Sequence, residues 1–369
     1  MNALKNMKKT TRSNLITYGI VVVFYVVVQA LTVGGVLNNS MKGMLVPICT
    51  YVVLAISLNL TVGILGELSL GHAGFMSVGA FSGAVFWVVT GSEMPSALGL
   101  ALSMLIGGVV AGVFGFLIGI PVLRLRGDYL AIVTLAFGEI IKNVLNTVYL
   151  GLDSNGFHFS IKDSASMGLA PDGDVIINGA IGISGMKKAS TFLAGIILIL
   201  ITLFVILNLI NSRAGRAIMS IRDNRIAAEA TGINATKYKL MAFIISAVFA
   251  GMAGVLYALN FSALAAKKFD YNTSILVLVF VVLGGIGNIR GSMIAATMLY
   301  VLPELLRGVA DYRMLVYAIV LIVMMIFNQS PQIVAWRAQM AERIAANPKF
   351  RKLAARFQKN GPQGEKGEA

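Results

Sequence analysis

Charged residues are scarce in this chain of 369 residues: only 12% are Asp, Glu, Lys or Arg, whereas 57% are hydrophobic. A soluble domain contains about 25% charged residues, because its surface has to be solvated by water. The low charge, with a mean hydropathy of +0.82, excludes an ordinary soluble globular protein. It predicts a protein solvated largely by lipid.

The residue types that most often carry chemistry are also few. Cys49 is the single cysteine, which excludes an intrachain disulfide and a cysteine-based metal site. The two histidines, His72 and His158, lie far apart in the sequence. No phosphate-binding Gly-Lys-Ser/Thr motif is present. The sequence therefore predicts no catalytic residue, no metal site and no cofactor held by this chain, and a membrane-embedded enzyme is the least supported class.

Long apolar runs fill the rest of the sequence. One crossing of a hydrocarbon core takes about 20 apolar residues. The runs predict an all-α polytopic membrane protein with ten spans, at 15–33, 44–65, 69–90, 97–120, 128–148, 191–210, 240–259, 273–289, 292–310 and 313–329. The first run follows basic residues, as in a signal peptide, but it is too long for one and no small-residue cleavage site follows. We interpret it as a retained span.

The positions of lysine and arginine predict the orientation. These residues accumulate on the cytoplasmic side of membrane spans. Placing both termini in the cytoplasm puts the clusters at 124–126 and 213–239 inside, provided that the Gly- and Ser-rich run at 69–90 crosses. The net charge of +14 is then explained by these loops and by anionic lipid, and not by nucleic acid, since no stacking aromatic residues interleave the basic ones.

The predicted organisation has three parts. Residues 1–14 form a basic cytoplasmic N-terminus, and 15–329 form the membrane domain, with an external loop at 151–190 and a cytoplasmic loop at 211–239. The external loop has scattered Gly and Ser and no long apolar period, so we expect a surface loop with short local structure. Residues 330–369 are expected to be a cytoplasmic basic tail, first amphipathic and then disordered.

Two polar features within the spans are candidates for a translocation pathway. His72, Gly74 and Ser77 lie in the segment SLGHAGFMSVGAFSG (69–83), which suits either a helix lining a pathway or a tightly packed helix. Glu139 falls near mid-span, where a carboxylate is costly unless it is paired or faces water. Either it lines a pathway, or it forms a structural pair with Lys142 one helical turn away.

The segment GRAIMSIRDNRIAAEATGIN (215–234) lies in the long cytoplasmic loop between spans six and seven and predicts one short helix, closed by Gly232. Its alanine-rich face favours docking in a groove of a cytoplasmic partner, whereas a membrane-surface helix would carry larger apolar groups. The candidate coupling residues are Gly215, Arg216, Ile218, Ile221, Arg222, Asp223, Ala227, Ala228, Glu229 and Gly232.

These segments, with LRLRGDYLAIVTLAFGEI (123–140) and VVLGGIGNIRGS (281–292), resemble the branched-chain amino-acid ABC transporter permeases of the LivM type. The resemblance runs from about Val46 to Phe327. It implies import of leucine, isoleucine and valine through the cell membrane of a prokaryote, with two cytoplasmic ATPase subunits that bind the ATP, a sister permease and an external binding protein. The segment from Ala227 to Gly232 would dock on an ATPase.

Two alternatives remain beside this resemblance. Importers of urea and short amides share the same motifs, so the substrate is less defined than the type of subunit. A secondary transporter would instead use Glu139 and His72 to carry coupling protons, and would transport without any ATPase.

Overall fold

The computed structural model describes residues 9–35, 37–125, 127–154, 156–171, 173–306 and 312–329. The chain divides into two units, residues 1–305 and 306–369, which are described separately. The predicted tail at 330–369 lies outside the described residues, as do residues 1–8 of the predicted N-terminal segment.

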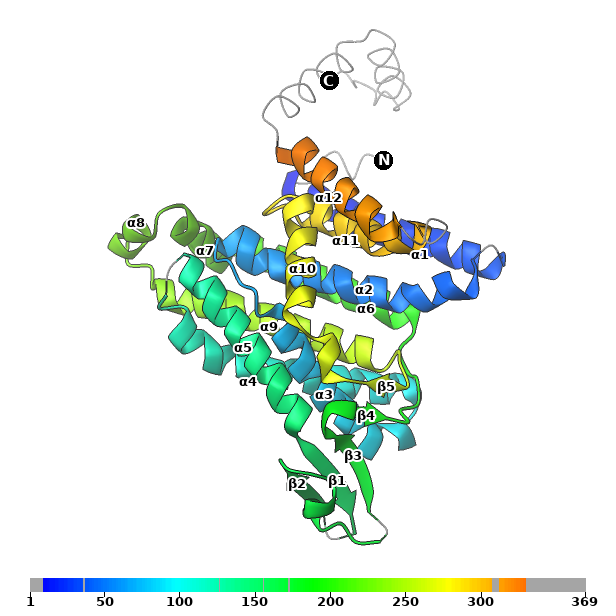
Figure 1. The fold of residues 1–369 in the computed structure, drawn as a ribbon. Helices are drawn as coiled ribbons and strands as arrows, with labels where there is room; N and C mark the ends of the chain where they lie inside the picture. The colour runs from blue at the N-terminus through cyan, green and yellow to red at the C-terminus, as the bar shows by residue number, and fades with distance from the viewer. Residues whose placement is uncertain are drawn as a thin grey trace, which may run out of the picture. The chain divides into compact units, whose positions relative to one another are not determined.

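Helices make up most of the described chain (Figure 1). The first unit contains α1 (Lys9–Val33), α2 (Asn39–Asn59), α3 (His72–Val89), α4 (Ser96–Val122), α5 (Asp128–Thr147), α6 (Phe192–Asn211), α7 (Arg213–Asp223), α8 (Arg225–Ala230), α9 (Ala235–Ala258), α10 (Tyr271–Gly284) and α11 (Ile289–Leu305). The second unit contains α12 (Arg313–Gln329). Short helical turns are η1 (Leu60–Leu65, a π-helix) and the 3-10 turns η2 (Gly91–Glu93), η3 (Ala165–Met167), η4 (Gly179–Ile181) and η5 (Ala266–Lys268).

Seven of the helices in the described part of the chain are long and apolar enough to span a membrane. They are α1 to α6 and α9, and they match the first seven predicted spans. The helices at the last three predicted spans are shorter: α10, α11 and α12 have 14, 17 and 17 residues. The seven membrane-spanning candidates each have 18 residues or more. The structure thus supports a polytopic membrane protein, and the three further crossings are taken up below as a proposal.

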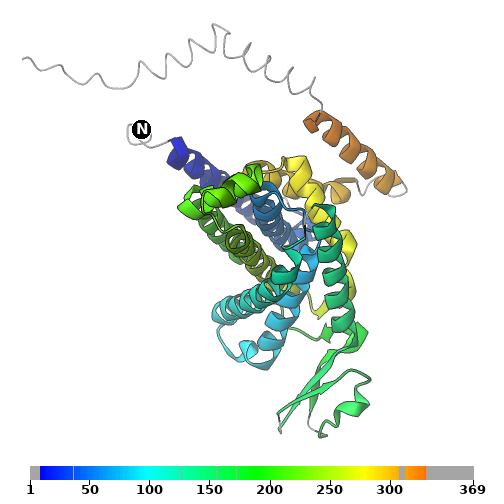
Figure 2. The same cartoon turned by 90° about the vertical axis from the view of Figure 1, so that its left-hand side faces the viewer.

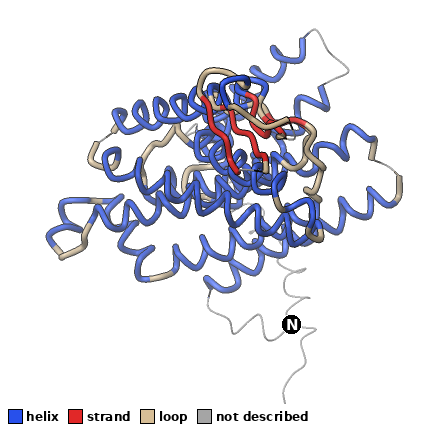
Figure 3. Tube along the Cα trace, turned by 90° about the horizontal axis from the view of Figure 1, so that it is seen from below, coloured by secondary structure: helices blue, strands red, loops and turns tan. Residues whose placement is uncertain are grey.

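The predicted external loop contains a small sheet, which the all-α prediction missed. Strands β1 (Tyr149–Asp153), β2 (Gly156–Ser160) and β3 (Asp174–Asn178) form an antiparallel sheet in the order β2-β1-β3, and β4 (Ile183–Ser184) pairs with β5 (Ala263–Leu264). The sheet extends beyond the helices and lies well apart from α7 and α8 (Figures 1 and 2). In Figure 3 all strands gather in one place. The sequence signal was the alternation of Phe157, Phe159 and Ile161 with polar residues.

Glycines hold the centre of the helical body together. Gly79 of α3 lies against the backbone of Gly251 in α9, and Gly107 of α4 lies against the carbonyl of Gly79. Gly254 in turn lies against the carbonyl of Met76. Small residues let helix backbones approach this closely where lipid supplies no hydrophobic drive for packing. The centre of the fold is therefore a three-helix contact of α3, α4 and α9.

A break in the helical structure separates α2 and its extension η1 from α3. The π-helix η1 extends α2, and Gly66 ends it with a φ of +80°, a conformation that glycine adopts without strain. Residues 66–71 are not helical, and α3 begins at His72 rather than at the predicted residue 69. Gly71 lies against the carbonyl of Thr134 in α5, so the start of α3 is fixed by packing.

Candidate functional site

The predicted coupling segment forms two helices, α7 and α8, and not one. The break lies at Asn224, which has an extended φ of −155° and ψ of 104°. Its side-chain oxygen accepts from the Ala227 N–H at 3.0 Å, which caps α8. Ser212 caps α7 in the same way through the Gly215 N–H, at 3.1 Å. The sequence prediction overlooked Asn224 as an N-cap because the helical pattern of small and charged residues continues across it.

The end of α8 is confirmed at Gly232, which has a φ of +85°. The Gly232 N–H donates to the Glu229 carbonyl at 3.0 Å, and the Ile233 N–H donates to the Ala228 carbonyl at 3.1 Å. This pair of bonds is the Schellman motif, and Ile233 also packs against the small cluster of Ile221, Ala228 and Ala235. The Schellman motif and the packing of Ile233 thus fix the direction in which the chain leaves α8 toward α9.

Replacing Gly232 with valine is expected to destabilise the end of α8 by about 1–2 kcal/mol, because a β-branched residue is strained at positive φ. Gly232→Asn is the matched control, since asparagine tolerates this conformation. Nothing lies within 4 Å of the space that a new Cβ would fill, so the effect is conformational. Hydrogen exchange of the amides at 225–233 measures it. Equal exchange in the two variants would contradict this account.

The coupling candidates divide into buried and exposed residues. Those buried inside this chain are Gly215, Ile218, Ile221 and Ala228, and those exposed are Arg216, Arg222, Asp223, Ala227, Glu229 and Gly232. The exposed side of α8 also carries Ile226, which the sequence analysis did not single out and which is 81% exposed. An isolated large aliphatic side chain on a short, capped helix is suited to insertion in a pocket of a partner. The surface that α8 leaves uncovered is therefore its Ile226 side, and the buried candidates pack beneath that surface.

Arg222 joins the coupling segment to the membrane helices. Its Nη1 donates to the Gly63 carbonyl in η1 at 3.2 Å, and its side chain packs beside Gly66. The guanidinium also pairs with Asp223 at 2.9 Å. Arg222 thus connects α7 directly to η1 and to the start of the non-helical segment before α3. The sequence analysis named Arg222 only as a candidate coupling residue, and the structure adds this contact within the chain.

A second tie lies beside it, between Lys239 at the start of α9 and Glu67. Their ion pair joins side chains that are only 6% and 14% exposed. Sequence analysis missed this pair, because Glu67 and Lys239 are separated by most of the membrane domain and their proximity depends on the tertiary fold. Together, the two ties attach the end of α7 and the start of α9 to the chain between α2 and α3.

Lys239→Met is expected to lower the stability of the folded chain by about 3 kcal/mol, because it leaves the Glu67 carboxylate buried without its partner. Adding Glu67→Gln removes that charge and should restore most of the loss. The matched control is Arg225→Met, which breaks the exposed pair with Glu229 at 2.8 Å and should cost about 0.5 kcal/mol or less. The unfolding midpoint in detergent tests all three. An unchanged midpoint in Lys239→Met would contradict the role of the pair.

The pathway candidates on α3 are packed and not solvated. His72 is 2% exposed, and its Nε2 lies 2.9 Å from the Ser57 hydroxyl of α2. The Ser77 hydroxyl donates to the Gly74 carbonyl of its own helix at 2.7 Å. Gly74 lies against the backbone of Gly138 in α5. In this conformation His72 and Gly74 form interhelical contacts and Ser77 is buried with its hydroxyl bonded to its own helix, so none of the three faces an open pathway.

The surroundings of His72 bring five helices together, α2, α3, α5, α9 and α10. The Ser246 hydroxyl of α9 donates to the Ser57 carbonyl at 2.5 Å, and the Ala73 N–H donates to the Ser274 hydroxyl of α10 at 3.0 Å. The Leu70 N–H donates to the Thr134 hydroxyl of α5 at 3.0 Å. Polar groups at this depth need such partners. The start of α3 is therefore held by hydrogen bonds to α2, α5 and α10.

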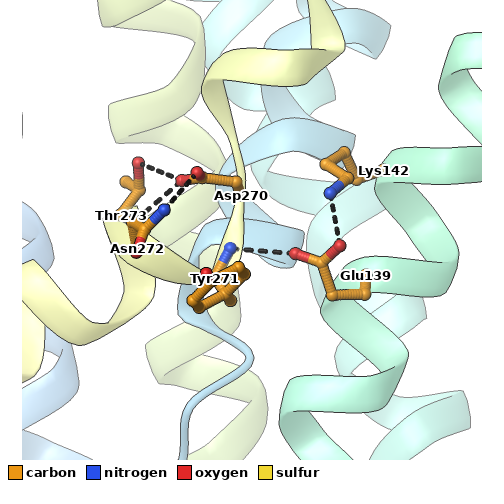
Figure 4. Close-up of polar contacts among 6 residues, drawn as sticks. All are labelled: Glu139, Lys142, Asp270, Tyr271, Asn272 and Thr273. Atoms are coloured by element: carbon orange, nitrogen blue, oxygen red, sulfur yellow. Dashed lines mark hydrogen bonds and ion pairs between the residues drawn. The ribbon is translucent and has the colours of Figure 1, made fainter.

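Glu139 joins two helices, as Figure 4 shows. One carboxylate oxygen forms the ion pair with Lys142, and the other accepts from the Tyr271 N–H at the first turn of α10, at 2.9 Å. Asp270 caps the same helix, accepting from the Thr273 N–H at 3.0 Å. A carboxylate is stabilised at a helix N-terminus. The pair with Lys142 that the sequence left open is present, and Glu139 in addition fixes α5 to α10.

A cavity of about 660 Å³ lies beside these residues, between α3, α4 and α5, and its lining includes Phe81, Phe114 and Phe137 but no charged side chain. Among the described residues, no three His, Cys, Asp or Glu side chains gather closely enough to hold a metal ion. The polar groups described around His72 and Glu139 join helices to one another.

The Gly-rich turn between α10 and α11 is tied to the same break. Asn59 is fully buried; its side-chain oxygen accepts from the Gly287 N–H at 2.9 Å, and its amide donates to the Ser292 hydroxyl at 2.8 Å. Gly285 and Gly287 both have positive φ. Asn59 therefore joins the end of α2 to this turn and to the first turn of α11.

The fold and the site define a multi-spanning membrane subunit with a capped pair of helices that presents an exposed isoleucine. A family described as "Branched-chain amino acid transport system / permease component" matches residues 40–327. The high-affinity branched-chain amino acid transport system permease protein LivM of Salmonella typhimurium is 36% identical over 302 residues, 79% of this chain and 69% of that protein. LivM of Escherichia coli is 37% identical over 305 residues, with the same coverage.

A nucleoside ABC transporter permease protein, NupC of Lactococcus lactis, is 25% identical over 193 residues, 52% of this chain and 59% of that protein. No solved structure matches the chain. The chain belongs to the branched-chain amino acid transport system permease family.

Proposed function

We propose that this chain is the membrane-spanning permease subunit of an ATP-driven importer of branched-chain amino acids. The observation that carries the proposal is the identity of 36% and 37% to two LivM permeases over 79% of the chain. The apolar character of the spans and the exposed side of α8 agree with it. The importer would act in the cell membrane of a prokaryote.

The proposed topology has ten spans with both termini in the cytoplasm. The seven long helices are joined by α10, α11 and α12 as the last three crossings. Basic residues crowd the α7–α8 segment, which supports a cytoplasmic position for it. The sheet β1–β3 would then lie outside, where it is available to an external binding protein. This arrangement is testable by labelling single introduced cysteines with an impermeant reagent, because Cys49 is buried.

The proposed partners are two ATPase subunits, a second permease and an external binding protein. In this mechanism, ATPase closure displaces α8, and α7 passes the movement through Arg222 to η1. The break at residues 66–71 then lets α3 shift against α5 and α10, exchanging the hydrogen bonds around His72. His72, Gly74, Ser77 and Glu139 are proposed to become accessible to substrate during that shift. Two alternative arrangements of packed helices are the usual basis of alternating access.

The experiment is uptake by reconstituted vesicles. The complex is purified from its source cell through a tag on this chain, and its subunits are identified by mass spectrometry. Vesicles containing the complex and its binding protein should accumulate labelled leucine only when ATP is supplied on the ATPase side. Vesicles containing this chain alone should accumulate none. Accumulation by the chain alone, driven by a proton gradient, would overturn the proposal in favour of a secondary transporter.

The substrate class is tested in the same vesicles. Leucine, isoleucine and valine should compete with one another for uptake, whereas urea, acetamide and a nucleoside should not. The nucleoside is included because permeases named for nucleoside and guanosine transport are 25% and 26% identical to parts of this chain. Uptake of one of these competitors in place of leucine would retain the transporter class and replace the substrate.

A further inference from the structure

Two surface cavities, together named the α1–α11 groove, follow one another along α1 and α11 and differ in character. Beside the turn at residues 285–288 lies a polar cavity of about 440 Å³, lined by Arg290, Thr17 and three asparagines, Asn14, Asn211 and Asn288. One helical turn further along α1 and α11 lies a cavity of about 250 Å³. Its lining is apolar apart from Thr297 and includes Ile20, Phe24, Ile294 and Met298.

The two cavities lie on successive turns of the same two helices. On α1 the lining passes from Asn14 and Thr17 to Ile20 and Phe24, and on α11 it passes from Arg290 to Ile294 and Met298. An α-helix rises 1.5 Å per residue, so the distance from Asn14 to Phe24 is about 15 Å. This is half of a hydrocarbon core about 30 Å thick. The groove therefore has the depth of one membrane leaflet.

The polar end is a positioned cationic site. The Arg290 Nε donates to the Thr17 hydroxyl at 2.6 Å, which holds the guanidinium at the wall between α11 and α1. Thr17 is 2% exposed, and the lining residues of both cavities include no aspartate or glutamate. A guanidinium beside side-chain amides matches the oxygens of a phosphate group. The apolar end is open, since Ile294 is 49% and Met298 60% exposed.

We propose that this groove binds an anionic phospholipid of the leaflet on the α7 side. The phosphate lies in the polar cavity against Arg290 and the asparagines, and an acyl chain follows α1 and α11 past Ile294 and Met298. Basic pockets between membrane helices are suited to anionic headgroups, and an acyl chain gains affinity with each buried methylene. The site is separate from the start of α3, and its occupancy does not depend on which solute is transported.

Binding is measured on the purified full chain after delipidation in detergent, with phosphatidylglycerol, phosphatidylcholine of the same chains, and inorganic phosphate as probes. Phosphatidylglycerol should bind best, and inorganic phosphate should neither bind nor compete. Arg290→Gln should weaken phosphatidylglycerol about fivefold and leave phosphatidylcholine unchanged, which is the effect of one basic group at a membrane surface. The matched control is Lys237→Gln, an exposed basic residue at the start of α9. It should bind as the wild type does.

Arg290→Gln also removes the hydrogen bond to Thr17. Two further variants test lipid binding and leave that bond in place. Asn211→Asp places a negative charge in the polar cavity and should weaken phosphatidylglycerol. Ile294→Trp fills the apolar end and should weaken both lipids, whereas Ile132→Trp, on an exposed side of α5, should weaken neither. Equal affinity of Arg290→Gln and wild type for phosphatidylglycerol would overturn the proposal. So would a cross-link from a cysteine at position 298 to the second permease, because protein would then cover the groove.

Discussion

Replacing Ile226 with aspartate is expected to abolish ATP-driven uptake without unfolding the chain. Ile226 is 81% exposed, so it contributes little to the packing of α8. Burying an isoleucine in a partner gains about 1.5–3 kcal/mol, and a carboxylate in the same pocket adds a desolvation cost. The combined change of at least about 3 kcal/mol corresponds to docking weakened more than a hundredfold. Vesicle uptake and the amount of ATPase co-purified with the chain measure it.

Two control variants test whether the effect depends on the apolar contact and on its position in α8. Ile226→Leu keeps the apolar contact and should retain most of the uptake. Ile181→Asp changes an isoleucine that is 64% exposed on the sheet side of the molecule, and should leave ATPase co-purification unchanged. The unfolding midpoint of Ile226→Asp should equal that of the wild type. Normal co-purification and normal uptake by Ile226→Asp would show that α8 is not the docking helix.

Replacing Gly79 with leucine is expected to give the largest loss of stability. A side chain at this position would overlap the backbone of Gly251 in α9, and a backbone cannot rotate away as a side chain can. Overpacking of this kind costs about 3 kcal/mol or more. The unfolding midpoint in detergent should fall by roughly 6 °C or more. The yield of folded protein should fall with it.

Gly19→Leu is the matched control, because Gly19 also lies within a membrane helix and nothing lies within 4 Å of its hypothetical Cβ. Its unfolding midpoint should stay within about 1 °C of the wild type, since the new side chain meets no protein atom. Equal midpoints for the two leucine variants would show that the close contact of α3 and α9 does not hold the fold together.

The helices that span the membrane were predictable because each carries its own signal. Helix α9 consists of an apolar run preceded by Asn234, whose side-chain oxygen accepts from the Lys237 N–H at 3.0 Å. Helix α8 is terminated by Gly232, two residues beyond its last helical residue, for a reason that is local to the backbone. Hydropathy and capping act over a few residues, so they can be read from the chain one segment at a time.

The predictions failed where a local signal was short or ambiguous. Asn224 divides the coupling segment, but the small residues around it continue a helical pattern. The alternation of Phe157, Phe159 and Ile161 with polar residues indicates a strand, but it covers only one short segment. A sheet in a long loop also depends on pairing with strands further along the chain, as β1 does with β3. Sequence periodicity alone does not define such partners.

The candidate pathway shows the same division. His72 and Glu139 were identifiable from sequence because polar residues are rare and costly at membrane depth. Their partners were not: Ser57 binds His72, and the Tyr271 N–H binds Glu139, across gaps of 15 and 132 residues. Asn59, Glu67 and Lys239 went unnoticed for the same reason. Each acts through a contact that is formed only when distant helices are packed.

The sequence by itself determined that this chain is a membrane protein, where most of its spans lie, which loops are basic and where α8 ends, since lipid solvation and helix capping are local properties of the chain. Only the tertiary structure decided that Ile226 is exposed while Ile221 is buried, and that Arg222 and Lys239 are tied to the break before α3. Those outcomes depend on which helix surfaces pack against each other. The periodicity of a helix does not identify the neighbouring helix that will cover it.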